Sequence, residues 1–163
     1  MESSRELFIT TIKDELPRFD RVFCAIPESK TDWRPHENSR SALEIMKTMI
    51  SDALSFPIFL EKGTMDSSDF VLSKSINPID LGFEFKEVMN ATLKIVDKMS
   101  NKAWDERAVM TDNDKMVWET TKGQMAWSIL LDQIHHRGQL SVYIRPMGGK
   151  VPAIYGPSGD SEK

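Results

Sequence analysis

Apolar side chains recur at the spacing of an α-helix in four separate stretches of the chain. These stretches run from Glu2 to about Ile26, from Ser39 or Ser41 to about Glu61, from about Leu81 to Met99, and from Thr121 to Arg145. The connections between them are polar, and almost no stretch alternates with the two-residue period of a strand. The pattern predicts an all-α protein built as a four-helix bundle.

Two segments outside these helices carry weaker expectations. Val109 to Trp118 is the one place where a short irregular hairpin is expected, around Asn113, although no strong strand signal supports it. The C-terminal tail is expected to pack Val151, Ile154 and Tyr155 against the bundle and to become polar and disordered from about residue 156. Neither expectation changes the predicted helical class.

The last helical stretch is apolar on two opposite sides. At about 100° per residue, one side carries Trp127, Leu131, Ile134, Gly138 and Val142. The other side carries Met125, Ile129, Asp132, His136, Leu140 and Tyr143. The remaining arc is expected to meet water and holds Ser128, His135 and Gln139. A helix that is apolar on two sides is usually covered on both, so the pattern predicts packing between its own bundle and a second subunit of a homodimer.

Asp132 and His136 are four residues apart, so they lie one turn from each other on one of these apolar sides. A buried carboxylate and a buried imidazole each need a partner, because an unpaired buried polar group is costly. Two interpretations stay open: the two side chains satisfy each other, or they contribute ligands or acid–base groups to a site inside the bundle. Thr48 and Asp52 have the same spacing, and they either face that pair or form a solvated stripe.

The composition restricts the class of protein. A chain of 163 residues without an internal repeat is expected to form one domain over 1–163. The formal charge of -4 and the lack of a Lys/Arg block argue against nucleic acid as a partner. No apolar run approaches the ~20 residues that cross a bilayer and no leader opens the chain, so the expected location is cytoplasmic. The single cysteine, Cys24, is expected to be a small core residue.

Two segments resemble the DinB-like family, which comprises the DinB and YfiT metal-binding bundles. Ala25 to Ile45 reads AIPESKTDWRPHENSRSALEI and resembles the family's loop and entry to the second helix. Ile134 to Asp160 reads IHHRGQLSVYIRPMGGKVPAIYGPSGD and resembles its C-terminal signature. The resemblance implies an up-and-down bundle with a long crossover link, commonly dimeric, in which three histidines hold a divalent ion such as zinc or nickel. Characterised relatives include thiol-dependent transferases and isomerases.

Carried over residue by residue, the family's histidine triad is degenerate in this chain. His136 falls on the second histidine of the family's H-x3-H pair, and Asp132 stands where the first would be. Thr48 stands where the second helix would supply its histidine, and Asp52, one turn further along, is a candidate replacement. A site of two carboxylates and one imidazole favours harder ions than three imidazoles do and holds them less tightly. A weakly bound or absent divalent metal is therefore expected.

Two classes of function stay open at the level of the sequence. The leading interpretation is a thiol-dependent transferase or small-molecule hydrolase, in which His136 is the remaining ligand or general base and Asp132 orients its imidazole. Asp52 or Thr48 would then line the opposite wall of a pocket that takes a small molecule or a thiol. The alternative is a non-catalytic dimeric bundle, either a small-ligand-binding or a stress-response protein.

Overall fold

Long helices, joined by irregular segments and a small sheet, make up the fold. The structure, a computed structural model, describes residues 2–161. The long helices are α1 (Ser4–Ala25), α2 (Ala42–Lys62), α3 (Pro78–Lys98) and α5 (Lys122–Ile144). The shorter elements are η1 (Glu28–Lys30), β1 (Thr64–Asp66), η2 (Ser67–Asp69), α4 (Asn101–Trp104), β2 (Arg107–Asp112) and β3 (Lys115–Thr121). All four helical stretches expected from the sequence are therefore present.

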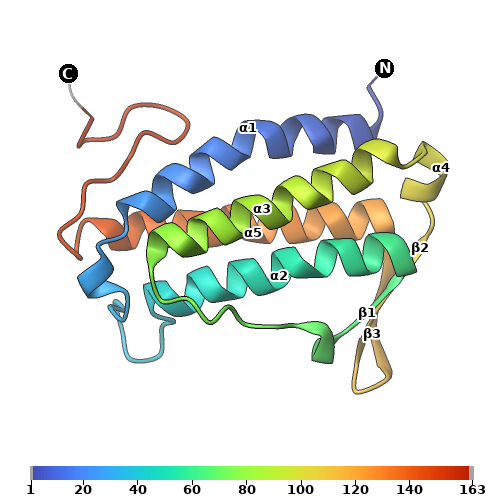
Figure 1. The fold of residues 1–163 in the computed structure, drawn as a ribbon, viewed down its shortest axis with the longest axis horizontal. Helices are drawn as coiled ribbons and strands as arrows, with labels where there is room; N and C mark the ends of the chain where they lie inside the picture. The colour runs from blue at the N-terminus through green and yellow to red at the C-terminus, as the bar shows by residue number, and fades with distance from the viewer. Residues whose placement is uncertain (1, 162–163) are drawn as a thin grey trace.

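The long helices contact one another in a ring, with α1 against α3 and α5, and α2 against α3 and α5. Figure 1 shows α2 and α3 running in the same direction, because the segment between them returns along the length of the helices before α3 begins. This return segment is the crossover link that the family resemblance implies. As a result, α2 and α5 lie next to each other and run in opposite directions (Figure 1).

A small sheet at one end of the helices corrects the all-α expectation (Figure 1). Its three strands lie in the order β1-β2-β3, with β1 parallel and β3 antiparallel to β2. The β2–β3 hairpin turns through Asn113 and Asp114, whose φ angles of 49° and 62° match the left-handed turn that joins strands tightly. The hairpin expected around Asn113 is thus confirmed, and the fold is mainly helical rather than purely α.

Gly63 connects α2 to the sheet. Its φ of 74° ends α2 in the left-handed conformation that L side chains rarely adopt. Its carbonyl oxygen accepts a hydrogen bond from the backbone N–H of Val109 at 2.9 Å, which aligns β1 beside β2. The end of α2 and the sheet are therefore held together by backbone contacts.

The two apolar sides of α5 have different environments. Met125 and Leu140 are fully buried in the core between the helices, whereas Leu131 and Val142 are 59% and 71% exposed. The side that carries Met125 therefore faces the bundle, whereas on the opposite side Leu131 and Val142 face outward and Trp127 and Ile134 pack partly against the core. The second subunit expected to cover that outward side stays a prediction. Within residues 2–161, no helix has the length and apolar character that crossing a membrane requires.

Cys24 is exposed on α1, so the expectation that it belongs to the core is wrong. Its neighbours Val22 and Phe23 are fully buried and take the inward direction at this turn of the helix. Partial burial raises the pKa of the Cys24 thiol, with a smaller contribution from the negative charge of Asp20. The reactive thiolate form is therefore disfavoured here.

The expectation of a disordered tail is also wrong over residues 156–161. The Ser158 hydroxyl donates to the carbonyl oxygen of Val151 at 2.5 Å. The Asp160 carboxylate accepts from the backbone N–H of Val151 at 2.9 Å and from the Arg145 guanidinium at 2.8 Å. These contacts fold the tail back on the end of α5. Residues 162–163, which the same expectation covered, lie outside the described residues.

Candidate metal site between α2 and α5

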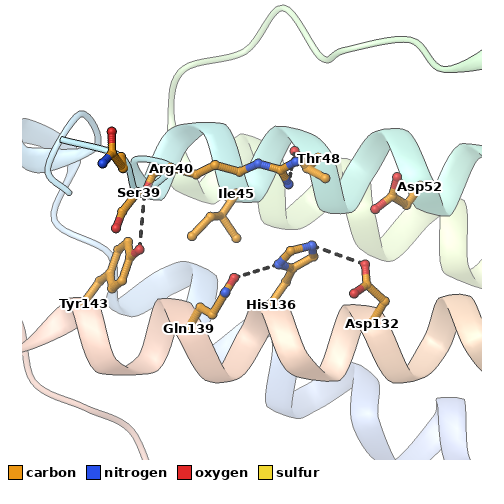
Figure 2. Close-up of a pocket in the computed structure, with 10 residues that line it drawn as sticks. Ser39, Arg40, Ile45, Thr48, Asp52, Asp132, His136, Gln139 and Tyr143 are labelled. Carbon is orange, nitrogen blue, oxygen red and sulfur yellow. Dashed lines mark hydrogen bonds and ion pairs between the residues drawn. The ribbon is translucent and has the colours of Figure 1, made fainter. Parts of the chain in front are cut away.

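A pocket of about 610 Å³ opens between α2 and α5 and collects the polar residues of both helices (Figure 2). From α2 it is lined by Ile45, Thr48 and Asp52, and from α5 by Asp132, His136, Gln139 and Tyr143. The loop before α2 adds Asn38, Ser39 and Arg40. All four residues singled out from the sequence, Thr48, Asp52, Asp132 and His136, therefore line one pocket.

His136 is held from both sides of its ring. The Nδ1 atom lies 2.8 Å from Oε1 of Gln139, and Nε2 lies 3.2 Å from Oδ2 of Asp132 (Figure 2). Because an amide oxygen can only accept, the ring donates from Nδ1, and a neutral ring then carries its lone pair on Nε2. That lone pair points at a carboxylate, so a proton or a cation is needed between them.

Burial differs strongly within this pair. The His136 side chain is 11% exposed, and the Asp132 side chain is 54% exposed. The imidazole therefore lies deep in the pocket wall, while the carboxylate of Asp132 reaches the pocket mouth. The sequence-based interpretation that the two side chains interact is supported by this geometry.

Asp52 faces this pair from α2 (Figure 2). Burial raises the pKa of Asp52 to about 6; the negative charge of Asp132 acts in the same direction, and the charges of His136 and Arg40 act against it. Two carboxylates this close repel each other unless a proton or a cation is shared. The interpretation of Thr48 and Asp52 as a solvated stripe is therefore wrong, since both face the pocket.

Thr48 has a different partner from the other three residues. Its hydroxyl accepts a hydrogen bond from the Arg40 guanidinium at 3.4 Å. The Tyr143 hydroxyl donates to the backbone carbonyl of Arg40 at 3.3 Å, which ties the loop before α2 to α5. The structure thus places Thr48 beside Arg40, and its role as a metal ligand stays a prediction.

The donor set of Asp52, Asp132 and His136 fits a divalent cation. Among residues 2–161 these three side chains form the group that could hold a metal, and their ligand atoms lie within 4.8 Å of one another. Two carboxylates supply negative charge, and the imidazole supplies a nitrogen lone pair oriented by Gln139. Mixed oxygen and nitrogen donors suit manganese, iron(II) or zinc, and they are less suited to soft ions.

The other two histidines lie outside this group. The His135 side chain is exposed, and its ring centre lies 5.6 Å from that of His136. His36 accepts a hydrogen bond from the backbone N–H of Asn38 at 3.1 Å, so it stabilises its own loop. Neither contributes to the three-residue cluster.

Gln139 and Arg40 were not predicted as site residues. The helical pattern assigns Gln139 to the water-facing arc of α5, three residues beyond His136. It reaches His136 because side chains three apart on a helix are neighbours. That i,i+3 spacing was the available signal for Gln139, whereas no sequence pattern marks Arg40, whose position depends on how the loop folds over the pocket.

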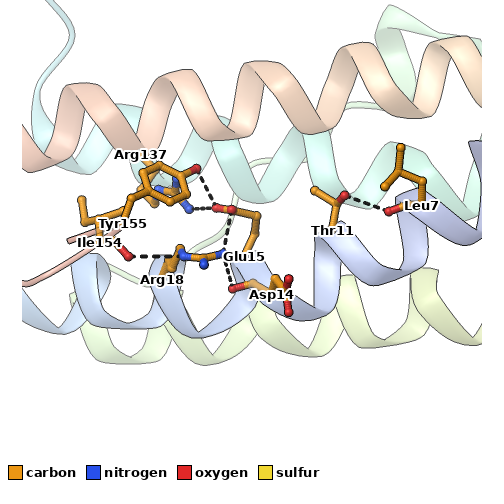
Figure 3. A network of polar contacts seen from close by, with 8 residues as sticks. All are labelled: Leu7, Thr11, Asp14, Glu15, Arg18, Arg137, Ile154 and Tyr155. Carbon is orange, nitrogen blue, oxygen red and sulfur yellow. Dashed lines mark hydrogen bonds and ion pairs between the residues drawn. The ribbon is translucent and has the colours of Figure 1, made fainter.

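A polar network around the buried Glu15 and Arg137 anchors α5 next to the pocket (Figure 3). The Arg137 guanidinium, 2% exposed, donates to the Glu15 carboxylate of α1 and, at 2.5 Å, to the Tyr155 hydroxyl of the tail. Arg18 pairs with the second oxygen of Glu15 at 2.8 Å. Because Arg137 directly follows His136, this network fixes the rotation of α5 that aims His136 into the pocket.

The ring of long helices, the crossover link and the small sheet define the DinB-like fold. The structure is similar to the crystal structure of a DinB-like protein, YjoA, from Bacillus subtilis, with a TM-score of 0.69. The two share 19% sequence identity, and the match covers 96% of this chain and 99% of that chain. At this identity the likeness is one of fold.

A sequence comparison gives the family. The DinB family profile matches residues 1–162, and the chain therefore belongs to the DinB family. No curated protein matches the sequence. The family resemblance read from the two sequence segments is thus confirmed.

Proposed function

We propose that this protein binds a divalent cation through Asp52, Asp132 and His136 and uses it for hydrolysis or group transfer on a small molecule. The observation that carries the proposal is the convergence of these three side chains within 4.8 Å at the wall of a pocket of about 610 Å³. When bound there, a divalent ion would supply Lewis-acid polarisation of a substrate oxygen.

The protein's own residues have distinct roles in this proposal. Gln139 keeps the proton on Nδ1 of His136, so that Nε2 stays available to the ion. Asp52 and Asp132 hold the ion from opposite helices, which makes its position depend on the packing of α2 against α5. The Arg40 guanidinium, which contacts Thr48 one turn before Asp52, attracts an anionic part of the substrate (Figure 2).

The set of ligands also supports a preference among metals. Two carboxylate oxygens and one imidazole nitrogen bind zinc and nickel less tightly than three imidazoles do, and they tolerate manganese well. We therefore propose a weakly held, exchangeable ion of the manganese, iron(II) or zinc type at this site.

One observation favours a second reading, a non-catalytic binder of small ligands. A proton on Nε2 of His136, which lies 3.2 Å from the Asp132 carboxylate, would satisfy both groups without a metal. In that case the pocket would bind a small ligand but would not catalyse a reaction.

Metal binding by the purified, tag-free protein separates these readings. Calorimetric titration with manganese, zinc and nickel should show one site per chain, lost in His136→Ala. The matched control is His135→Ala, because the neighbouring exposed histidine lies outside the cluster and its loss should leave binding unchanged. Absence of binding by all three ions would exclude the metal-dependent function.

A bound ion should then be tested for chemistry. Ester, amide and thiol-transfer substrates would be assayed with the manganese-loaded protein, the His136→Ala variant and the His135→Ala control. Turnover in the two proteins that bind the metal, and none in His136→Ala, would support the enzymatic function. Metal binding without any turnover, combined with ligand binding, would favour the second reading.

A further inference from the structure

An apolar chamber adjoins the candidate metal site. Its volume is about 250 Å³, and it shares Asp52 and Asp132 with the larger pocket. In Figure 2 these two carboxylates lie at one end of the pocket, and Tyr143 lies at the other. Ser55, one turn beyond Asp52 on α2, lines the chamber, as does Ser128, one turn before Asp132 on α5. The chamber therefore continues the pocket past the carboxylates.

The sheet builds the outer wall of this chamber. Each of its three strands contributes one large side chain: Met65 from β1, Met110 from β2 and Trp118 from β3. Phe70 of the crossover link and Ile129 of α5 complete the apolar lining. Methionine side chains adapt readily to the shape of a bound group. The element that departs from a pure helical bundle is thus the one that forms the outer wall of the chamber.

The chamber offers few polar groups to a ligand. The Ser55 hydroxyl is already used, because it donates to the backbone carbonyl of Asp52 at 2.5 Å. An apolar group placed here would leave water and gain contacts, without losing hydrogen bonds of its own. The volume of about 250 Å³ is larger than the ~150 Å³ of a cavity that accommodates benzene. A phenyl ring or a branched alkyl group fits this space.

A positive charge is available in the pocket, because the Arg40 guanidinium lies above His136, between Tyr143 and the two carboxylates (Figure 2). Arg40 is exposed, and its guanidinium contacts the neutral Thr48 hydroxyl at 3.4 Å. Within the described residues, no carboxylate lies within ion-pair distance of Arg40, although Arg34, Arg107 and Arg145 each pair with one. A guanidinium over a pocket binds carboxylate groups well, because its planar donors match two oxygens.

We propose that the site takes small amphipathic organic acids, with the apolar group in the chamber, the reacting centre beside Asp52, Asp132 and His136, and the acid group at Arg40. The position of the reacting centre rests on the proposed function, whereas the two ends of the ligand rest on the chamber and on Arg40. The chamber and the Arg40 guanidinium lie on either side of Asp52 along the groove between α2 and α5 (Figure 2).

The first test compares three probes by calorimetry, with and without manganese: 4-phenylbutyrate, butyrate and 4-phenylbutyramide. The phenyl group should strengthen binding relative to butyrate by about tenfold or more, as for apolar groups in fitted pockets. The acid should bind roughly tenfold more tightly than the amide, and Arg40→Gln should remove that difference. Equal affinity for butyrate and 4-phenylbutyrate would overturn the assignment of the chamber.

Two variants locate the phenyl group. Met110→Trp fills the chamber and should weaken the binding of 4-phenylbutyrate by about tenfold, while the binding of butyrate is unaffected. Met116→Trp is the matched control, since Met116 is 61% exposed on the same hairpin and does not line the chamber. If both tryptophan variants bind 4-phenylbutyrate like the wild type, the phenyl group is not in the chamber and the proposal fails.

A gain-of-binding variant keeps the test valid even if Met110→Trp folds poorly. Ile129→Ala enlarges the chamber and should shift preference from 4-phenylbutyrate toward the larger 4-(2-naphthyl)butyrate. An unchanged preference would count against the chamber. Titration with manganese alone is scored separately, so a chain that binds the phenyl probe but no metal would refute the proposed function and leave the ligand site supported.

Discussion

The imidazole of His136 links Asp132 to Gln139, with Nε2 at 3.2 Å from the carboxylate and Nδ1 at 2.8 Å from the amide oxygen. The three residues belong to α5, so a single helix both presents the imidazole and orients it. Only Asp52 comes from another helix. The convergence of Asp52 with Asp132 and His136 therefore depends on α5 being held at one rotation relative to α2.

Replacing Gln139 tests the orientation of the imidazole. Gln139→Leu removes the acceptor for Nδ1–H and should weaken manganese affinity by about tenfold or more. Losses of this size are common when a metal-binding histidine loses the residue that accepts a hydrogen bond from its other ring nitrogen. Gln139→Glu keeps an acceptor and should retain binding. Calorimetric titration of the three proteins measures the effect, and equal affinities would show that Gln139 does not orient the ring.

The acidity of Asp52 predicts a pH dependence of stability in the absence of metal. Its pKa of about 6 in the folded protein lies above the ordinary value of 3.8, so the folded state binds more protons between these values. The contribution of this group is fully present below pH 3.8 and is lost as the pH rises through about 6. The charges of Asp132, His136 and Arg40 also act on Asp52. Because one proton is involved, the free energy of unfolding should change by at most about 1.4 kcal/mol per pH unit.

Asp52→Asn is the control for this dependence, because it stays neutral at every pH. Urea denaturation of both proteins at several pH values between 4 and 7 gives the difference in free energy of unfolding. The wild type should lose stability relative to Asp52→Asn as the pH rises through this range. Parallel curves would contradict a raised pKa for Asp52.

The buried pair of Glu15 and Arg137 should dominate the stability of the polar network. Glu15→Gln leaves the Arg137 charge without its partner and should cost about 3–5 kcal/mol of unfolding free energy. Glu119→Gln at the exposed pair with Arg107 is the control and should cost roughly 1 kcal/mol or less. Denaturant titrations compare the two, and similar losses would mean that burial adds nothing to the Glu15 pair.

Two glycines of α5 should respond oppositely to alanine. A Cβ at Gly123 would overlap Nε1 of Trp104, so Gly123→Ala should destabilise the protein by about 1–3 kcal/mol. A Cβ at Gly138 meets no atom within 4 Å, so Gly138→Ala should stabilise the helix by about 0.5–1 kcal/mol. Thermal melts distinguish them. Loss of stability in Gly138→Ala would indicate that another surface packs closely at that position.

We predict that a homodimer forms through the outward side of α5, where Leu131 and Val142 are exposed. Light scattering after size exclusion should give the mass of two chains for the wild type and of one chain for Leu131→Lys combined with Val142→Lys. Val117→Lys, an equally apolar and exposed position on the hairpin, should leave the mass unchanged. A monomeric wild type would show that this surface is simply solvated.

The helical part of the fold could be predicted because each long helix carries its own periodic pattern. The three residues of β1 carry no pattern, and their pairing with β2 depends on contacts made much later in the chain. The hairpin was predicted around Asn113, whose residue type suits a left-handed turn, while the apolar residues of β3 are consecutive and do not alternate with polar ones as in a half-buried strand. Local signals therefore predicted the helices, and tertiary pairing decided the sheet.

The same division holds for the site. The contact of Asp132 with His136 follows from helical spacing alone, because both lie on α5. Whether Asp52 faces them could not be decided from spacing, since it requires the mutual rotation of two helices. The outward position of Cys24 was missed because an apolar neighbourhood along the sequence does not determine which way one side chain points.

Tyr155 and Asp160 join the C-terminal segment to α1 and α5 through hydrogen bonds with Glu15 and Arg145. During synthesis α5 and this segment emerge after α1, α2 and α3, so those three helices are first exposed with one side of their shared core uncovered. Neither the carboxylate pair nor the chamber exists until then, since Asp132 and Ile129 arrive with α5. The proposed ion and ligand sites can therefore form only once α5 has emerged and packed, and truncation before Tyr155 should leave a chain that needs chaperones.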